Sequence, residues 1–261
     1  MPKRYFIRII TPLLISSAVT AMILFSVKQH VQYDRIYEDV AAWSAFFSVF
    51  GIVYAIVAGF LLVTVLTKYS DLSQVIENEL NAIETVRDFL TYLDDTNQAV
   101  NKSIRDALSH YTFSLLNKEW PEMSDPNEPM DSDTSEELYE IMRKSKGISV
   151  DTESAGVVFT ALIENISDIT KLRTRRIALA NERLPPRLKI LMIFMSVVLI
   201  VAFILMGVQN IYTHAVILVS LTIAIHLLYM IIEDLDHPFY GIWNINRSPL
   251  EELVNRFCKD K

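Results

Sequence analysis

The fold is decided by residues 190–232, which read ILMIFMSVVLIVAFILMGVQNIYTHAVILVSLTIAIHLLYMII. This run contains no Asp, Glu, Lys or Arg. A helix rises about 1.5 Å per residue and needs about 20 apolar residues to cross a hydrocarbon core, so the run is long enough for two crossings. Polar residues at its middle indicate a short turn between the two: Gln209, Asn210, Tyr212, Thr213 and His214.

Two further uncharged runs occupy residues 9–27 and 41–67. Together with the long run they predict four transmembrane helices, at about 8–27, 43–66, 190–208 and 213–232. A helix of a soluble protein needs a solvated face, which runs of this length lack. The first run is too long for the core of a cleaved signal peptide, so we expect an uncleaved anchor. The sequence thus predicts an all-α integral membrane protein.

The middle segment, 68–187, has the patterning of amphipathic helices. No helix breaker separates Thr67 from Asp71, so the second span is expected to continue as one long helix. A second piece should end near Trp120-Pro121. Thr134-Ser-Glu-Glu137 fits a capping box that opens a short helix, which stops at Gly147, and a last helix is expected at 154–183. The predicted organisation is spans one and two in 1–67, a cytoplasmic helical domain in 68–187, spans three and four in 188–233, and a cytoplasmic C-terminal tail in 234–261.

The distribution of basic residues predicts the orientation in the membrane. Lys3, Arg4 and Arg8 precede the first span, whereas the 209–213 turn carries no charge. Loops rich in Lys and Arg stay on the cytoplasmic side, so both termini and the middle segment are expected to be cytoplasmic. The approach to the third span carries six more cations: Arg173, Arg175, Arg176, Arg183, Arg187 and Lys189.

Composition and motifs argue against several function classes. The net charge of -7 does not favour nucleic acid, and the single cysteine, Cys258, excludes an intrachain disulfide or a cysteine metal cage. P-loop, GxSxG and HExxH signatures are missing, so we expect no enzyme activity, cofactor or metal. The run Asp131, Asp133, Ser135, Glu137 lacks the glycine and glutamate of an EF-hand loop and is interpreted as a solvated loop with a helix cap.

Small residues recur on one face of the second span. They follow steps of three and four: Ser44, Ser48, Gly51, Ala55, Ala58 and Gly59. Small side chains let helices approach closely in lipid. The stripe either packs within one subunit or lines a pore or a subunit interface, and the neighbouring Phe46, Phe47 and Phe50 could form a constriction.

The fourth span carries a polar stripe, Thr222, His226, Tyr229 and Glu233, spaced by four, three and four residues. Polar groups at membrane depth usually face protein or a water-filled path. Either His226 is hydrogen-bonded to a neighbouring helix or the stripe belongs to a functional pathway. The candidate pore-lining residues are therefore Ser44, Ser48, Gly51, Ala55, Phe47, Thr222, His226, Tyr229 and Glu233.

Three short motifs carry a family resemblance: Lys118-Glu-Trp-Pro121, Leu184-Pro-Pro186 and Asp234-Leu-Asp-His-Pro-Phe-Tyr-Gly241. With four spans and a Glu79-containing helix after the second, the chain resembles the bestrophin-like domain family of prokaryotic membrane proteins, which is distantly similar to bestrophin channels. The family motif would comprise Asp236, Pro238, Phe239 and Gly241. Locally, Pro238 ends the fourth span and Gly241 permits a sharp turn.

The resemblance implies a homo-oligomeric ion channel, a tetramer or pentamer, in the plasma (inner) membrane, with lipid and inorganic ions as partners. Bestrophin likeness implies anions, whereas exposed acids at the two mouths would concentrate cations: Glu38 and Asp39 outside, Glu233, Asp234 and Asp236 inside. The alternative function is a non-conducting membrane scaffold or sensor that docks a protein partner through the helix faces at 72–93 and 159–172.

Overall fold

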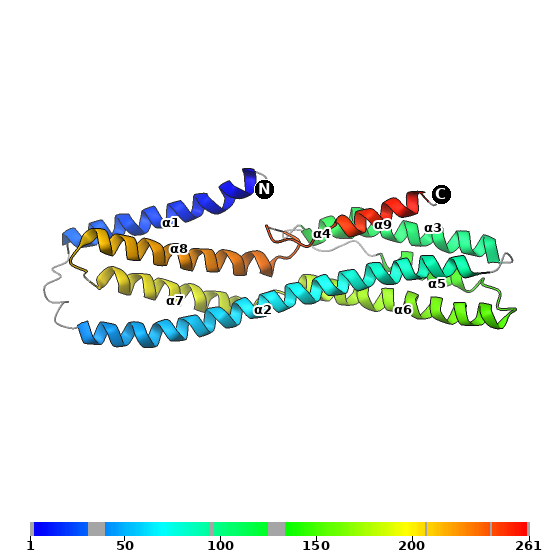
Figure 1. The fold of residues 1–261 in the computed structure, drawn as a ribbon, viewed down its shortest axis with the longest axis horizontal. Helices are drawn as coiled ribbons and strands as arrows, with labels where there is room; N and C mark the ends of the chain where they lie inside the picture. The colour runs from blue at the N-terminus through cyan, green and yellow to red at the C-terminus, as the bar shows by residue number, and fades with distance from the viewer. Residues whose placement is uncertain are drawn as a thin grey trace. The chain divides into compact units, whose positions relative to one another are not determined.

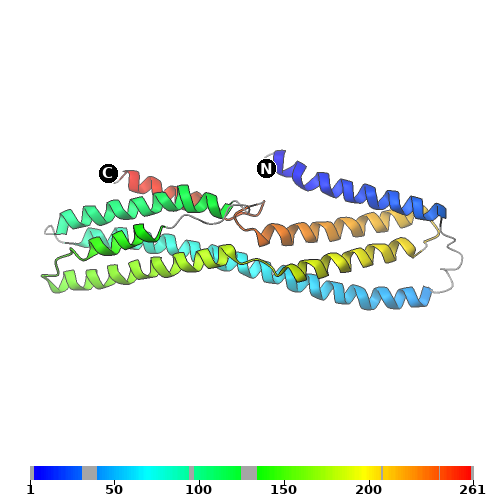
Figure 2. The same ribbon diagram turned by 180° about the vertical axis from the view of Figure 1, so that it is seen from behind.

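A computed structural model describes residues 3–30, 40–93, 97–124, 134–206, 208–240 and 242–259 (Figures 1 and 2). Every regular element in these ranges is helical. Four helices are long and apolar enough to cross a membrane, within Ile10–His30, Ala41–Tyr92, Glu153–Leu205 and Ile211–Asp236. The predicted all-α fold with four potential spans is confirmed.

The chain forms two compact units. Met1–Thr67 and Arg183–Asp236 form the first, here called the membrane unit. Lys68–Glu182 and His237–Lys261 form the second, the helical unit. The C-terminal segment, expected to be a tail, instead contributes α9 (Ser248–Lys259), which buries Leu250, Leu253 and Phe257 in the core of the helical unit.

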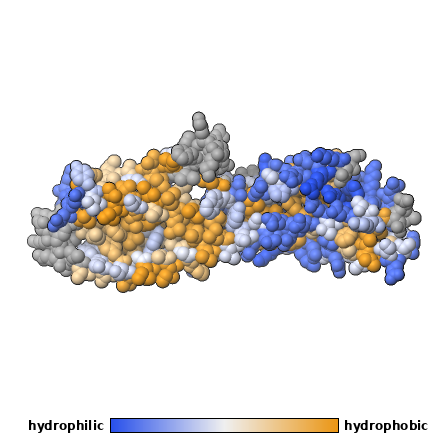
Figure 3. All heavy atoms as spheres, in the orientation of Figure 1, coloured by the Kyte–Doolittle hydropathy of each residue, from blue (hydrophilic) through white to orange (hydrophobic). Residues whose placement is uncertain are grey.

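The membrane unit contains α1 (Lys3–His30), the first part of α2 (Val40–Phe89), α7 (Pro186–Leu205) and α8 (Ile211–Asp236). In both views α1 runs along α8, and Leu24, Ile204 and Leu218 form a small core there. Many large apolar side chains point outward, and Figure 3 shows an apolar surface over this unit. A continuous apolar surface of this kind fits lipid rather than water as the solvent.

The turn predicted at the middle of the long apolar run is present. Asn210 Oδ1 accepts hydrogen bonds from the backbone N–H groups of Tyr212 (2.9 Å) and Thr213 (3.3 Å), which caps the start of α8. Lys28 Nζ donates to the carbonyl oxygens of Val208 and Gln209 at 3.2 and 3.1 Å. These bonds satisfy backbone groups that would otherwise be left unpaired at the ends of two apolar helices.

The helical unit begins with the rest of α2, which runs without a break to Phe89, as predicted. One apolar core joins its helices, with Ile83, Leu108, Ile141 and Ile169 all fully buried. The elements that follow α2 in this unit are a 3₁₀ turn (Leu90–Tyr92), α3 (Gln98–Ser114), a π-helical turn (Leu115–Glu119), α4 (Trp120–Ser124), α5 (Ser135–Ser145), α6 (Glu153–Asn181) and α9.

The helix expected to end near Trp120-Pro121 continues through the π-helical turn into α4. Proline has no N–H group and disrupts the regular α-helical ladder before it. A π turn widens the helix by one residue and absorbs that disruption without ending the helix. It also leaves the carboxylate of Glu119 fully buried in the core of the helical unit.

The capping box predicted at Thr134 is wrong in its side-chain part. Thr134 does stand before α5, and the helix ends near Gly147 as expected. Its hydroxyl, however, makes no cap and donates instead to Glu119 Oε1 at 2.6 Å. The oxygen of this hydroxyl accepts from Arg173 Nε at 2.8 Å in place of a backbone N–H group, because a charged donor makes the stronger hydrogen bond.

Six side chains form what we call the buried ion cluster: Glu79, Tyr111, Glu119, Thr134, Arg173 and Arg176. Arg176 is fully buried and binds two carboxylates, with Nε 2.7 Å from Glu79 Oε2 and Nη2 2.6 Å from Glu119 Oε2. Arg173 Nη2 lies 2.7 Å from Glu119 Oε1, and Tyr111 donates to Glu79 Oε1 at 2.6 Å. The cluster joins α2, α3, the π turn and α6.

The cluster corrects the basis of the orientation prediction. Arg173 and Arg176 are neutralised inside the helical unit and so do not count as free flanking charges. A sequence signal was available, because Arg173 and Arg176 follow Ile169 by four and seven residues and so continue the apolar stripe of α6. Charges at apolar stripe positions indicate buried, paired groups.

We expect Arg176→Met to destabilise the helical unit by about 3–5 kcal/mol, because it leaves Glu79 and Glu119 buried with their main charge partner removed. The measurement is the free energy of unfolding of the purified protein in denaturant. Lys171→Met is the matched control on the same helix, since Lys171 pairs with Asp168 in an exposed bridge worth about 0–1 kcal/mol. Equal losses in the two variants would contradict this role of Arg176.

The cluster also predicts acid sensitivity. Burial alone would raise the pKa of Glu119, but the charge of Arg176 and hydrogen bonds from Thr134 and Arg176 lower it below its usual 4.5. A carboxyl with a lowered pKa in the folded state stabilises fully above its unfolded pKa and loses that contribution as the pH falls toward the folded value. The free energy of unfolding should therefore decrease as the pH falls below about 4.5. The decrease should be steeper in the wild type than in Glu119→Gln. Glu164→Gln, an exposed change on α6, should keep the wild-type slope.

Candidate functional site

Most of the small-residue stripe of α2 is left uncovered by the described residues of the subunit. Ser44, Ser48, Ala55 and Gly59 are exposed, and a Cβ atom built on Gly51 or Gly59 would meet nothing within 4 Å. Ala58, 2% exposed, packs with Tyr54 and residues of α7 and α8, and Gly51 is partly buried. Packing within one subunit therefore does not explain most of this stripe.

Phe47 lies on a different face from the exposed serines. Its ring centroid is 4.3 Å from that of Phe203 in α7, and it packs on the core formed by Tyr54, Ala58 and Met195. Phe46 and Phe50 stack on each other at 5.1 Å. The structure thus separates Phe47, which packs inside the subunit, from Ser44 and Ser48, which do not.

The polar stripe of α8 is satisfied within the subunit at its two ends. Thr222 is buried and donates to the carbonyl oxygen of Leu218, while Glu233 is paired with Lys189 at 2.9 Å. Between them, Tyr229 is half-buried. Among the residues that the structure describes, no hydrogen-bond partner reaches the buried Nε2 atom of His226. The hydrogen bond expected from His226 to a neighbouring helix is thus not made by this atom.

An ion cluster fastens the end of α8 to the segment before α7. Asp236 is fully buried, its Oδ1 accepts from the backbone N–H of Leu184 at 2.9 Å, and its Oδ2 lies 2.8 Å from Lys189 Nζ. The condition that Asp236 be exposed at an inner mouth is therefore not met. The charge of Glu233 is also offset, because it shares the same lysine.

The rest of the family motif packs on the π-turn segment of the helical unit. The ring of Phe239 meets Trp120 edge to face at 5.2 Å, and the carbonyl oxygen of Pro238 accepts from the N–H of Ile245 at 2.8 Å. Two of the quoted motifs, 118–121 and 234–241, thus meet in space. Gly241 lies outside the described residues, as do Glu38, Asp39, Asp131 and Asp133.

The remaining residues of the acidic run have structural partners. Ser135 Oγ is 3.1 Å from Arg173 Nη1, and Glu137 lies 3.8 Å from Lys118. Over the described ranges, no group of three His, Cys, Asp or Glu side chains could hold a metal ion. The chemistry that these residues offer is therefore packing and ion pairing.

We expect Asp236→Ala to cost about 3 kcal/mol of stability. The substitution removes the buried carboxylate that pairs with Lys189, and it leaves the N–H of Leu184 without its acceptor. Glu233→Ala is the control, since it removes the partly exposed partner of the same lysine and should cost about 1 kcal/mol or less. Thermal unfolding of both variants in one detergent measures the difference. A larger loss in Glu233→Ala would overturn the structural role of Asp236.

A family model described as the Bestrophin-like domain matches residues 11–250. Two point-mutated forms of a bacterial bestrophin homolog from Klebsiella pneumoniae have similar structures. One has a TM-score of 0.73 at 17% identity, covering 97% of each chain, and the other has 0.71 at 16%, covering 100% of this chain and 97% of that chain.

A third structure of that homolog, phased by Zn-SAD, has a TM-score of 0.71 at 17% identity over 95% of each chain. At sequence identities this low, the structural similarity establishes a shared fold. No curated protein matches the sequence. The family model, in contrast, matches nearly the whole chain, from the first predicted span to the start of α9. This chain therefore belongs to the bestrophin-like domain family.

Proposed function

We propose that the protein is a homo-oligomeric ion channel of the plasma (inner) membrane, a tetramer or pentamer with both termini in the cytoplasm. The observation that carries the proposal is the uncovered small-residue stripe of α2. In an oligomer this stripe would line the central axis or the contact next to it. Membership of the bestrophin-like family and four potential spans support the same conclusion.

The exposed surface of α2 has two chemically different parts. Large apolar side chains suited to lipid occupy one, including Val49 and Ile56, each 66% exposed. The small stripe occupies the other, where Ser48 donates to the carbonyl oxygen of Ser44 at 2.9 Å. Lipid contact requires no small residues, whereas close helix contact or a narrow aqueous path does. The division supports an oligomer built around this stripe.

Polar groups of α8 and α2 favour an ion pathway over a purely structural contact. His226 keeps a buried ring nitrogen with no partner among the described residues, and such a group at membrane depth is expected to meet water or another subunit. The inner boundary is less acidic than the sequence suggests, because Lys189 offsets Glu233 and Asp236. One lysine offsets one of these two negative charges, which weakens the case for cation selectivity, and the bestrophin likeness favours anions.

The scaffold alternative loses its main support. Its proposed docking faces, 72–93 and 159–172, supply the core of the helical unit, where Leu72, Ile83, Leu162 and Ile169 are all at most 1% exposed. A face already buried against neighbouring helices is not available to a partner protein. The channel is therefore the function that the geometry supports best.

The test is ion flux from liposomes that contain the purified full-length protein. Ser48→Leu should reduce flux by about tenfold or more, because a large apolar side chain on the stripe narrows and dehydrates the path. Val49→Leu is the matched control on the adjacent lipid-type surface and should leave flux unchanged. His226→Ala should also alter flux. Absence of flux from the wild type across voltages and salts, or equal effects of Ser48→Leu and Val49→Leu, would reject the proposal.

A further inference from the structure

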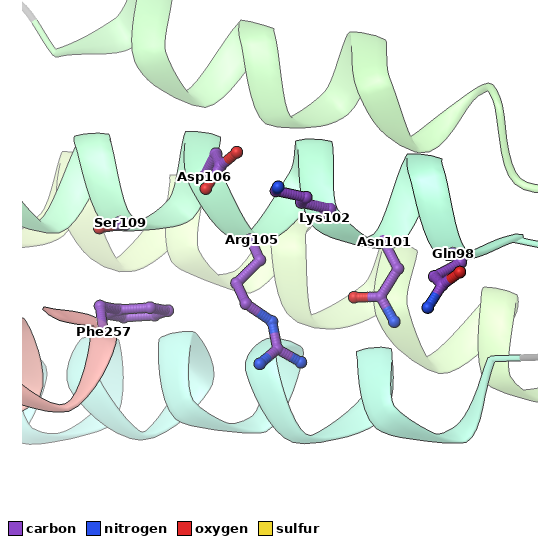
Figure 4. Close-up of a pocket in the computed structure, with 7 residues that line it drawn as sticks. All are labelled: Gln98, Asn101, Lys102, Arg105, Asp106, Ser109 and Phe257. Carbon is purple, nitrogen blue, oxygen red and sulfur yellow. The ribbon is translucent and has the colours of Figure 1, made fainter. Parts of the chain in front are cut away.

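The helical unit has a polar groove between α3 and α9 (Figure 4). Its cavity volume is about 640 Å³, and its lining comprises Gln98, Asn101, Lys102, Arg105, Asp106, Ser109 and Phe257. Small-molecule sites typically occupy about 300–1,000 Å³. In the close-up, Phe257 of α9 stands at one end, and Gln98 stands at the other, near the start of α3. The groove is large enough for a polyatomic ligand and far larger than a single halide ion.

Arg105 extends from α3 toward α2, whereas Asp106 points to the other side of α3 (Figure 4). A second cavity, of about 390 Å³, shares Arg105 and is lined besides by residues from the end of α2 and from α9: Arg87, Asp88, Thr91, Arg256 and Lys259. Arg105 therefore borders both cavities.

The groove combines paired and free cations. Arg87 is bound to Asp88 at 2.9 Å, and Arg256 is bound to Glu84 at 2.5 Å. In the part of the chain that the structure describes, neither Arg105 nor Lys102 forms an ion pair. The two linings together hold five cations, from Arg87, Lys102, Arg105, Arg256 and Lys259, against the two acids Asp88 and Asp106. The cavities thus present a local excess of positive charge in a protein whose net charge is -7. Such an excess attracts anions in preference to the rest of the surface.

We propose that this groove binds a polyphosphate anion, a ligand with at least two linked phosphate groups. The guanidinium of Arg105 offers a planar fork that matches phosphate oxygens, and Lys102 adds a point charge. The side chains of Gln98 and Ser109 supply neutral donors along the same groove. The side-chain amide of Asn101 already donates to the carbonyl oxygen of Leu90, so it holds the wall of the groove in place and is not counted among the ligand donors. This site is independent of the proposed conduction path.

Isothermal titration calorimetry with inorganic tripolyphosphate, on the full chain in detergent at constant ionic strength, tests the proposal. The wild type should bind, Arg105→Gln should weaken binding by about tenfold or more, and Lys102→Gln should weaken it by less. Lys171→Gln removes an exposed lysine elsewhere in the helical unit and should leave affinity unchanged. Both groove positions are at least partly exposed, so the variants are expected to fold.

Three results would overturn the inference. They are no binding of tripolyphosphate by the wild type, equal affinity for it in Arg105→Gln and Lys171→Gln, or wild-type affinity for sulfate equal to that for tripolyphosphate at matched ionic strength. Weaker binding of orthophosphate than of tripolyphosphate would support it, because two cavities that share Arg105 favour an elongated anion. Liposome flux does not enter this test. A protein that fails to conduct would still be expected to bind tripolyphosphate.

Discussion

The helical unit is organised around one fully buried guanidinium. Arg176 binds Glu79 of α2 and Glu119 of the π turn, and Glu119 is shared with Arg173. Burial by itself lowers the pKa of Arg176, but the nearby carboxylates, Glu79 above all, raise it above its ordinary value, so the charge persists. Because an unpaired charge in such a place is strongly unfavourable, the helices that carry these groups must hold one mutual arrangement.

The π turn follows from the same constraint. A regular helix would carry its ladder of hydrogen bonds into Pro121, which cannot donate. The wider turn accommodates the proline, leaves Glu119 among the arginines and places Trp120 against Phe239. The hydroxyl of Thr134 is drawn into the cluster as well, which is why a local capping motif fails to act as one. A buried charge network here overrides local helix signals.

The membrane unit obeys a different constraint, since its solvent is lipid. Large apolar side chains point outward, and backbone groups at the turn between α7 and α8 are satisfied by Lys28 and Asn210. Within the described part of this unit, the exposed Ser48 and the His226 ring nitrogen that lacks a hydrogen-bond partner are two features that apolar packing does not explain. They are therefore where a conduction path is best sought.

The sequence by itself determined the all-α class and the four spans, because the length and charge of an apolar run depend only on local composition. It also located the polar turn at Asn210 and the long continuation of α2. Only the tertiary structure decided that Arg176 and Glu119 pair in a core, that Asp236 is buried, and that Arg105 borders a groove. Those features join residues far apart in the chain, and no local pattern specifies which distant partner satisfies a buried charge.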